Sequence, residues 1–183
     1  MTDTRAIPPE ERSAEEARTE GARTDSPVLE RLDRHSTDSA VAVVGHPIHA
    51  MLVHFPIAFV IATLGADLLF WYSADPFWVR AGLWAAGFAF LSGVAASAVG
   101  TAELLLVKGI RIRVASWTHA VAAMTLLAIA GANWGLRLVA PEVVLPHGLA
   151  LSVLAAVVTG LAGWHGGKLV FDHGIGIMVS PRQ

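Results

Sequence analysis

HPIHAMLVHFPIAFVIATLGADLLFWYS, residues 46–73, is the stretch that decides the fold. Two histidines, His46 and His49, flank a proline at its start, and it contains one acidic residue, Asp67. As an α-helix rising about 1.5 Å per residue, it would be longer than the roughly 30 Å hydrocarbon core of a bilayer. The stretch therefore predicts a helix that spans a membrane.

Three further apolar segments follow, at residues 77–107, 114–138 and 146–170. Short connections at residues 74–76, 108–113 and 139–145 force consecutive helices to run antiparallel. Within a bilayer, the backbone has to satisfy its own hydrogen bonds, which a helix does. The hydrophobic fraction of 54% agrees with a chain that lies mostly in lipid. We therefore predict an all-α fold, a four-helix transmembrane bundle with up-down-up-down topology.

Residues 1–40 differ in composition from the rest of the chain. They hold ten of the fifteen acidic and six of the thirteen basic residues, a local net charge of −4. Residues 1–25 have no hydrophobic period and are predicted to be disordered. Residues 26–34 either continue this tail or form a short helix on the membrane surface. We expect a disordered or interfacial tail at 1–40 and a four-helix transmembrane domain at 41–183.

Basic residues are distributed unevenly between the two ends of the predicted helices. The cytoplasmic side of a membrane protein carries the excess of lysine and arginine. Only Arg80 and Arg137 flank one end, whereas the other end has Arg31, Arg34, Lys108, Arg111, Arg113, Lys168 and Arg182. Both termini are therefore expected in the cytoplasm.

Ionisable residues are expected to gather at the cytoplasmic end of the bundle. They come from all four helices and lie at a similar depth: His49, His54, Glu103, His119, His165 and Lys168. Ionisable side chains in hydrocarbon are costly, so they are usually paired, coordinated or functional.

Three interpretations of this cluster remain open. The chain has no cysteine, so an iron, copper or zinc ion would depend on histidine. In the first interpretation a haem b is bound, with His119 as one axial ligand and His54 or His165 as the other. Glu103 and Lys168 would line that site, and Arg111, Arg113 or Lys168 would neutralise the propionates. In the second, a non-haem metal is bound by some of His49, His54, His119 and His165. In the third, the cluster is a structural polar network without a cofactor.

A second polar group is expected toward the outer half of the bundle, and it comprises Asp67, Arg80, Asn133, Arg137 and His147. Asp67 is the acidic residue placed deepest in the membrane. Its structural interpretation is an ion pair with Arg80 or Arg137, and its functional interpretation is a proton relay.

Several classes of function are disfavoured. The sequence has no glycine-rich phosphate loop, no G-x-S-x-G and no H-E-x-x-H motif, so catalysis is not expected. It shows no inverted repeat, which disfavours a secondary transporter. The net charge of −2 gives no reason to expect nucleic-acid binding. The second helix carries a stripe of small residues that would permit close packing and a homo-oligomer: Gly82, Ala85, Ala89, Gly93, Ala96 and Gly100.

The start and end of the apolar region resemble a bacterial family of four-helix membrane proteins, domain of unknown function 2231. His46-Pro47-Ile48-His49 matches the family's His-Pro-x-His-Pro signature, although Ala50 replaces the second proline. GWHGGKLVFDHGIGIM resembles the family's Gly-Gly-x-Leu-Val-Tyr-x-His-Gly-Val-Gly ending, with Lys168 where many members have histidine or glutamate. The similarity covers about residues 46–178.

The resemblance implies a location and a class of activity. Members lie in bacterial membranes, so we expect this chain in the plasma membrane, in contact with the lipid bilayer. Some relatives are fused to Rieske or cytochrome c domains, which suggests electron transfer with a redox-protein partner. The sequence therefore favours a haem- or metal-binding redox subunit, with a structural or accessory membrane protein as the alternative.

Overall fold

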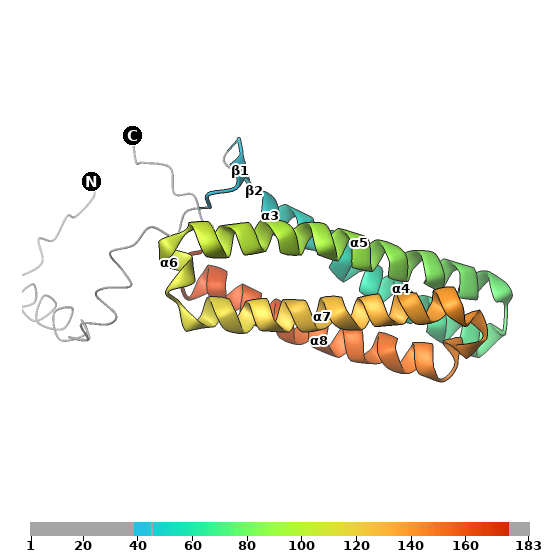
Figure 1. The fold of residues 1–183 in the computed structure, drawn as a ribbon. Helices are drawn as coiled ribbons and strands as arrows, with labels where there is room; N and C mark the ends of the chain where they lie inside the picture. The colour runs from blue at the N-terminus through green and yellow to red at the C-terminus, as the bar shows by residue number, and fades with distance from the viewer. Residues whose placement is uncertain (1–38, 45, 176–183) are drawn as a thin grey trace, which may run out of the picture. The chain divides into compact units, whose positions relative to one another are not determined.

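The computed structural model describes residues 39–44 and 46–175, which all belong to one unit of the chain (Figure 1). The tail was predicted at residues 1–40, and all of it except residues 39 and 40 lies outside the described residues. The described elements, in chain order, are β1 (Ala42–Val43), β2 (His46–Pro47), α3 (Ile48–Leu52), α4 (His54–Ser73), α5 (Pro76–Leu106), α6 (Lys108–Arg111), α7 (Val114–Val139), the 3₁₀ helix η1 (Pro141–Val144) and α8 (His147–Phe171).

The first predicted helix is divided at Val53 into α3 and α4. Pro56 lacks an N–H and therefore cannot donate to the carbonyl of Leu52 in the preceding turn. The two pieces still form one apolar span, Ile48–Ser73. The predicted effect of Pro56 on this helix thus occurs three residues before the proline.

The boundary between α4 and α5 follows from local chemistry. Ala74 adopts a left-handed conformation after α4, with φ of 55°. Asp75 then caps α5, because its Oδ1 accepts a hydrogen bond from the backbone N–H of Phe77 at 2.8 Å. Pro76 occupies the first position of α5, where its missing N–H removes no helical bond.

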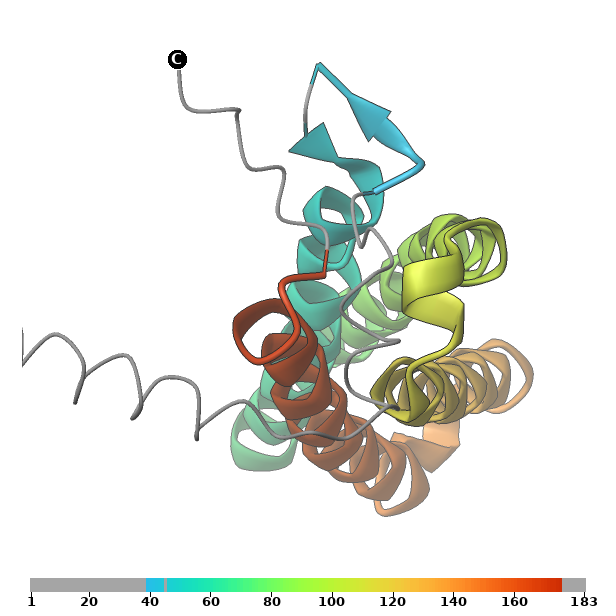
Figure 2. The same ribbon diagram turned by 90° about the vertical axis from the view of Figure 1, so that its left-hand side faces the viewer.

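The four long helices lie around the bundle in the order α4, α5, α7, α8, and α8 closes the ring against α4 (Figure 2). We call α3, α4 and α5 the first hairpin, and α7 and α8 the second hairpin. The predicted four-helix bundle is confirmed. The short β1–β2 pairing ahead of α3 and the short helices α6 and η1 were not predicted.

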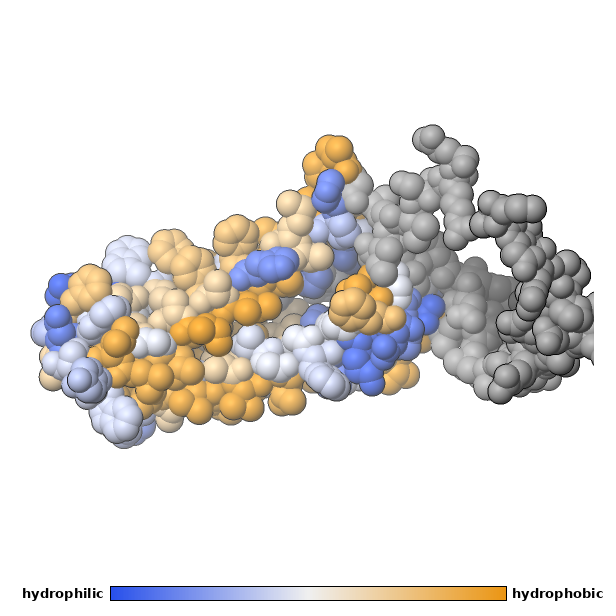
Figure 3. All heavy atoms as spheres, turned by 180° about the vertical axis from the view of Figure 1, so that it is seen from behind, coloured by the Kyte–Doolittle hydropathy of each residue, from blue (hydrophilic) through white to orange (hydrophobic). Residues whose placement is uncertain are grey.

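Small residues fill the space between the helices, and large apolar residues point outward. Ala89 and Ala155 pack with Val60 in the core. Trp84 on α5 is 67% exposed and Phe171 on α8 is 88% exposed. Figure 3 shows apolar residues covering much of the side of the bundle, with hydrophilic residues mainly toward its ends. All four spans are long and apolar enough to cross a membrane, so this outer surface is suited to contact lipid.

The stripe of small residues on α5 faces inward. Gly82, Ala89 and Ala96 are buried inside the chain. The stripe therefore packs α5 against its neighbours within the chain.

Candidate functional site

Two histidine rings meet between the hairpins near the end of the bundle that holds α6. His49 on α3 and His119 on α7 have ring centres 6.4 Å apart, with their planes inclined by 80°. The Nδ1 atom of His49 lies 2.9 Å from the carbonyl oxygen of Ala96, and that of His119 lies 3.1 Å from the carbonyl oxygen of Ala162. A carbonyl oxygen can only accept, so each Nδ1 carries a proton, and in the neutral form of each ring Nε2 keeps its lone pair. No residue in the described part of the chain bonds either Nε2 atom.

A glycine lies beside each of these rings. A Cβ atom added at Gly100 would be 2.6 Å from Cε1 of His49, and one added at Gly166 would be 3.1 Å from Cε1 of His119. Each glycine lies one turn after the alanine whose carbonyl accepts the histidine proton. The missing side chain therefore lets each ring lie against the backbone of the neighbouring helix.

The other two predicted histidine ligands, His54 and His165, differ in their surroundings. His54 is exposed, and its Nδ1 bonds the carbonyl oxygen of Met51 in its own segment at 3.3 Å. His165 is half-buried on α8 and lies within electrostatic range of His119. The structure places both His49 and His165 near His119, and of these two His49 makes the ring contact with it.

Glu103 and Lys168 do not bond the histidine pair. Glu103 is buried on α5, and its carboxylate accepts a hydrogen bond from the hydroxyl of Ser39. Lys168 is 55% exposed and lies 3.9 Å from Asp172. Within residues 39–44 and 46–175, no group of three or more histidine, aspartate and glutamate side chains is arranged to hold a metal ion.

One polar atom near the histidine pair lacks a partner. Ser116 lies one turn before His119 on α7 and is buried. Its hydroxyl has no hydrogen-bond partner among the described residues. A buried hydroxyl without a partner is costly, so this position calls for a water molecule or another polar group at the same end of the bundle.

A buried polar network occupies the opposite half of the bundle. Asp67 on α4 is 0% exposed, and its Oδ2 lies 2.6 Å from Nη2 of Arg137 on α7. The hydroxyl of Ser152 on α8 donates to the same Oδ2 at 2.6 Å. Asn133 completes the network: its Oδ1 accepts from Nε of Arg137 and its Nδ2 donates to Ser152, both at 2.9 Å. These bonds join three helices and neutralise both charges.

Of the two predicted partners of Asp67, the structure selects Arg137. Arg80 is exposed, and so is His147. Two atoms of the ion pair, Oδ1 of Asp67 and Nη1 of Arg137, have no hydrogen-bond partner among the described residues. Both lie in front of Gly82, whose absent Cβ would be 3.4 Å from the first and 2.8 Å from the second.

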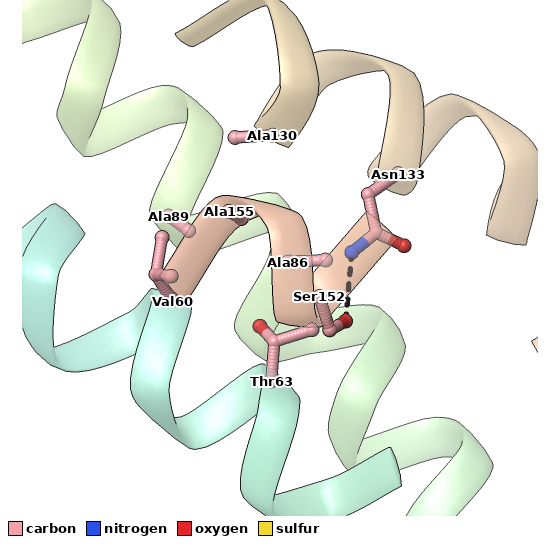
Figure 4. Close-up of a pocket in the computed structure, with 8 residues that line it drawn as sticks. All are labelled: Val60, Thr63, Ala86, Ala89, Ala130, Asn133, Ser152 and Ala155. Carbon is pink, nitrogen blue, oxygen red and sulfur yellow. Dashed lines mark hydrogen bonds between the residues drawn. The ribbon is translucent and has the colours of Figure 1, made fainter. Parts of the chain in front are cut away.

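A small cavity lies next to this network between the four helices (Figure 4). Its polar lining comes from Thr63, Asn133 and Ser152, and the rest is alanine and valine. About 10 Å³ is open to the centre of a water molecule, which is close to the room that one water needs. The cavity is too small for an organic ligand.

Ser152 is the network residue that the sequence did not reveal. A single serine in an apolar helix is a weak signal, because its hydroxyl can bond the carbonyl of its own preceding turn. Thr159 on the same helix does this with Ala155 at 2.8 Å. Only the position of α4 against α8 shows that Ser152 instead bonds Asp67.

Comparison with known proteins identifies the family. The model of the family "Predicted membrane protein (DUF2231)" matches residues 45–178. No curated protein and no protein of solved structure matches the chain. The matched range covers all four spans and both histidine-containing ends, as the sequence resemblance predicted. The chain therefore belongs to the DUF2231 family of membrane proteins, and it is a multi-pass membrane protein.

Proposed function

We propose that this membrane protein binds one haem b between His49 and His119 and serves as an electron-transfer subunit. The observation that carries the proposal is the edge-to-face pair of imidazoles, each oriented through Nδ1 by a backbone carbonyl. A carbonyl or carboxylate that holds Nδ1–H is the usual partner of a histidine whose Nε2 binds a metal.

The number of ligands favours haem over a bare metal ion. A structural zinc ion takes four ligands, and a catalytic one takes at least three from the protein. The described residues offer no such group of three. A haem would need at most two ligands from the protein, which is the number that His49 and His119 would supply.

The separation of the rings also suits this role. Metal–imidazole bonds are about 2 Å long, so two imidazoles that held one metal between them would have ring centres roughly 6 Å apart. The ring centres of His49 and His119 are 6.4 Å apart. A haem held by His49 and His119 would supply one-electron transfer.

The surrounding side chains suit the propionates of the cofactor. Arg111 and Arg113 lie in the connection around α6, at the same end as His49 and His119, where their guanidinium groups bond backbone carbonyls. The hydroxyl of Ser116 adds a buried donor close to His119. Lys168 provides a further positive charge at this end.

The proposal includes a membrane sidedness. Arg137 pairs with Asp67 inside the bundle, so it does not count among the loop residues that set orientation. Removing it from the count strengthens the bias that places α6 in the cytoplasm. We infer that the protein lies in the bacterial plasma membrane with both termini inside, and that its redox partner approaches from the cytoplasmic side.

The test is a dithionite-reduced minus air-oxidised visible spectrum of the purified protein, expressed with haem precursor supplied. We expect a Soret shift with sharp α and β bands, and complete loss of these bands in His49→Ala and in His119→Ala. His54→Ala is the matched control and should retain them, because His54 is exposed and bonds only its own segment. A colourless wild-type protein at full haem supply, or bands that survive in both variants, would overturn the proposal.

A second readout separates ligation from folding. In His119→Gly, added imidazole can enter the space of the missing ring and coordinate in its place. We expect imidazole to restore the bands in this variant and to leave the spectrum of His54→Ala unchanged. Failure of imidazole to restore any absorbance in a variant that elutes as a monodisperse peak would contradict direct ligation by His119.

A structural or accessory role is the second candidate function. The observation that favours it is that both polar groups already join helices: each histidine bonds a neighbouring helix, and the Asp67 network joins three. In this case the histidine variants would lose stability, and the wild-type protein would show no absorbance with haem supplied.

A further inference from the structure

Two halves of the sequence place the same kinds of residue at a constant spacing. His49, Thr63 and Asp67 on the first span are followed 70 residues later by His119, Asn133 and Arg137 on the third. Identical residues recur at the same spacing at several other positions: Ala50 and Ala120, Ala58 and Ala128, Ala62 and Ala132, Gly65 and Gly135, Leu68 and Leu138.

The second and fourth spans repeat in the same way at a spacing of 66. The matching residues are Gly82 and Gly148, Leu83 and Leu149, Ala89 and Ala155, Ala96 and Ala162, Gly100 and Gly166. The two spacings differ by four residues. Relative to α7 and α8, the facing ends of α4 and α5 are nine residues longer in total, whereas the loop between them is five residues shorter. Each repeat thus comprises one whole hairpin.

The structure gives matched residues matched environments. His49 bonds the carbonyl of Ala96 and lies on Gly100, while His119 bonds the carbonyl of Ala162 and lies on Gly166. Burial follows the same pattern, since both members of each of five matched pairs are buried. The pairs are Val60 and Ala130, Thr63 and Asn133, Asp67 and Arg137, Ala86 and Ser152, and Glu103 and Leu169. Equal environments for residues of different hairpins indicate a rotation that superimposes one hairpin on the other.

The central cavity obeys the same relation (Figure 4). Thr63 matches Asn133, and Ala86 matches Ser152. The remaining lining residues pair likewise, Val60 with Ala130 and Ala89 with Ala155. A cavity lined only by matched pairs lies on the axis that relates the pairs. The neighbour relations agree, because a twofold rotation that exchanges α4 with α7 and α5 with α8 also exchanges the α5–α7 contact with the α8–α4 contact.

We propose that the transmembrane domain is built from two copies of one helical hairpin related by an approximate twofold axis along the bundle, and that the ligand site lies on this axis. Each hairpin contributes one half-site: a histidine, the alanine carbonyl that orients it, and the glycine on which its ring packs. Gly100 and Gly166 are thereby positioning residues. This is a parallel repeat, with both hairpins entering the membrane from the same side, and it differs from the inverted repeats of many transporters.

The outer network shows where the copies have diverged. Two identical residues at positions 67 and 137 would place like charges together, whereas Asp67 and Arg137 form a neutral pair. The residues that bond this ion pair have diverged as well. Ser152 bonds Asp67 and Asn133 bonds Arg137, whereas their counterparts Ala86 and Thr63 bond neither. Both glycines that leave room for the guanidinium, Gly82 and Gly148, remain the same.

The test exchanges the network across the axis in the full chain. The variant Asp67→Arg alone places two guanidinium groups together, and we expect its thermal midpoint in detergent to fall by about 10 °C or more. The six-residue exchange Asp67→Arg, Arg137→Asp, Thr63→Asn, Asn133→Thr, Ala86→Ser and Ser152→Ala rebuilds the same network in the rotated position. We expect it to recover most of that loss. An exchange variant no more stable than Asp67→Arg would overturn the twofold relation.

The half-sites are tested separately. This part of the inference rests on the proposed function, since its readout is bound haem. We expect Gly100→Ala and Gly166→Ala each to lower the haem content and to broaden the α band, with Gly65→Ala and Gly135→Ala as the matched control pair. Gly100→Ala should have the larger effect, because its Cβ would lie closer to the ring. If only one of Gly100→Ala and Gly166→Ala lowered the haem content, the two half-sites would not be equivalent, although haem binding itself would stand.

A colourless wild-type protein would overturn the haem proposal. The exchange experiment does not depend on haem and would still test the twofold relation.

Discussion

Replacing Arg137 by alanine is expected to lower the free energy of unfolding by about 3–5 kcal/mol. The substitution leaves the carboxylate of Asp67, which is 0% exposed, without its charge partner. It also removes the donor to Oδ1 of Asn133. Thermal unfolding in detergent, followed by circular dichroism, measures the effect. Arg80→Ala is the matched control, because Arg80 is exposed near the same end of the bundle.

A double variant distinguishes loss of a pair from loss of volume. Asp67→Leu with Arg137→Met replaces both charges by apolar groups of similar size, which is often neutral or stabilising for a buried pair. We expect it to recover most of the stability lost in Arg137→Ala. If Arg137→Ala were as stable as Arg80→Ala, the ion pair would contribute nothing to the fold. A stable double variant would also provide a folded protein in which the proton-relay interpretation of Asp67 is testable.

The fold was predictable because its signals are local. A span needs only length and apolar composition, and the predicted segments differ from the observed helices by a few residues at each end. The break at Val53 follows from Pro56, although the sequence does not show at which residue the helix divides. The β1–β2 pairing has two residues per strand, which is too short to show any periodicity.

The polar sites were predictable in membership and depth, whereas their pairing was not. His54 follows His49 by five residues, so a regular helix turns it by about 140° away from His49. The sequence shows this angle but not which side of the helix faces the bundle. Likewise, Asp67 had two candidate partners at similar depth, and the rotation of α5 and α7 decided between them by leaving Arg80 exposed and Arg137 inside.

The repeat is present in the sequence as a constant spacing, but its signal is weak because many matched residues differ in type. Asp67 against Arg137 and Thr63 against Asn133 are both polar pairs but not identical ones. The matched histidines alone are too few to indicate a duplication. Shared burial and shared contacts make the relation clear, since they compare environments and not residue types.

Gly82→Ala is expected to lower the free energy of unfolding by about 1–3 kcal/mol, the usual effect of an overpacked core. The new Cβ would lie 2.8 Å from Nη1 of Arg137. A flexible side chain could move aside, but this guanidinium is 2% exposed and bonded to Asp67, Asn133 and Ser152.

Gly65→Ala should have the opposite effect and stabilise the protein by about 0.5–1 kcal/mol, because a glycine inside a helix costs backbone entropy. No atom lies within 4 Å of the Cβ that it would add. The decisive comparison repeats Gly82→Ala in the Arg137→Ala background, where the guanidinium is absent and the substitution should become nearly neutral. An equal cost in both backgrounds would show that Gly82 is required by the backbone of α5 alone. If Gly82→Ala no longer lowered the stability in the Arg137→Ala background, Gly82 would be required by the ion pair that joins the two hairpins.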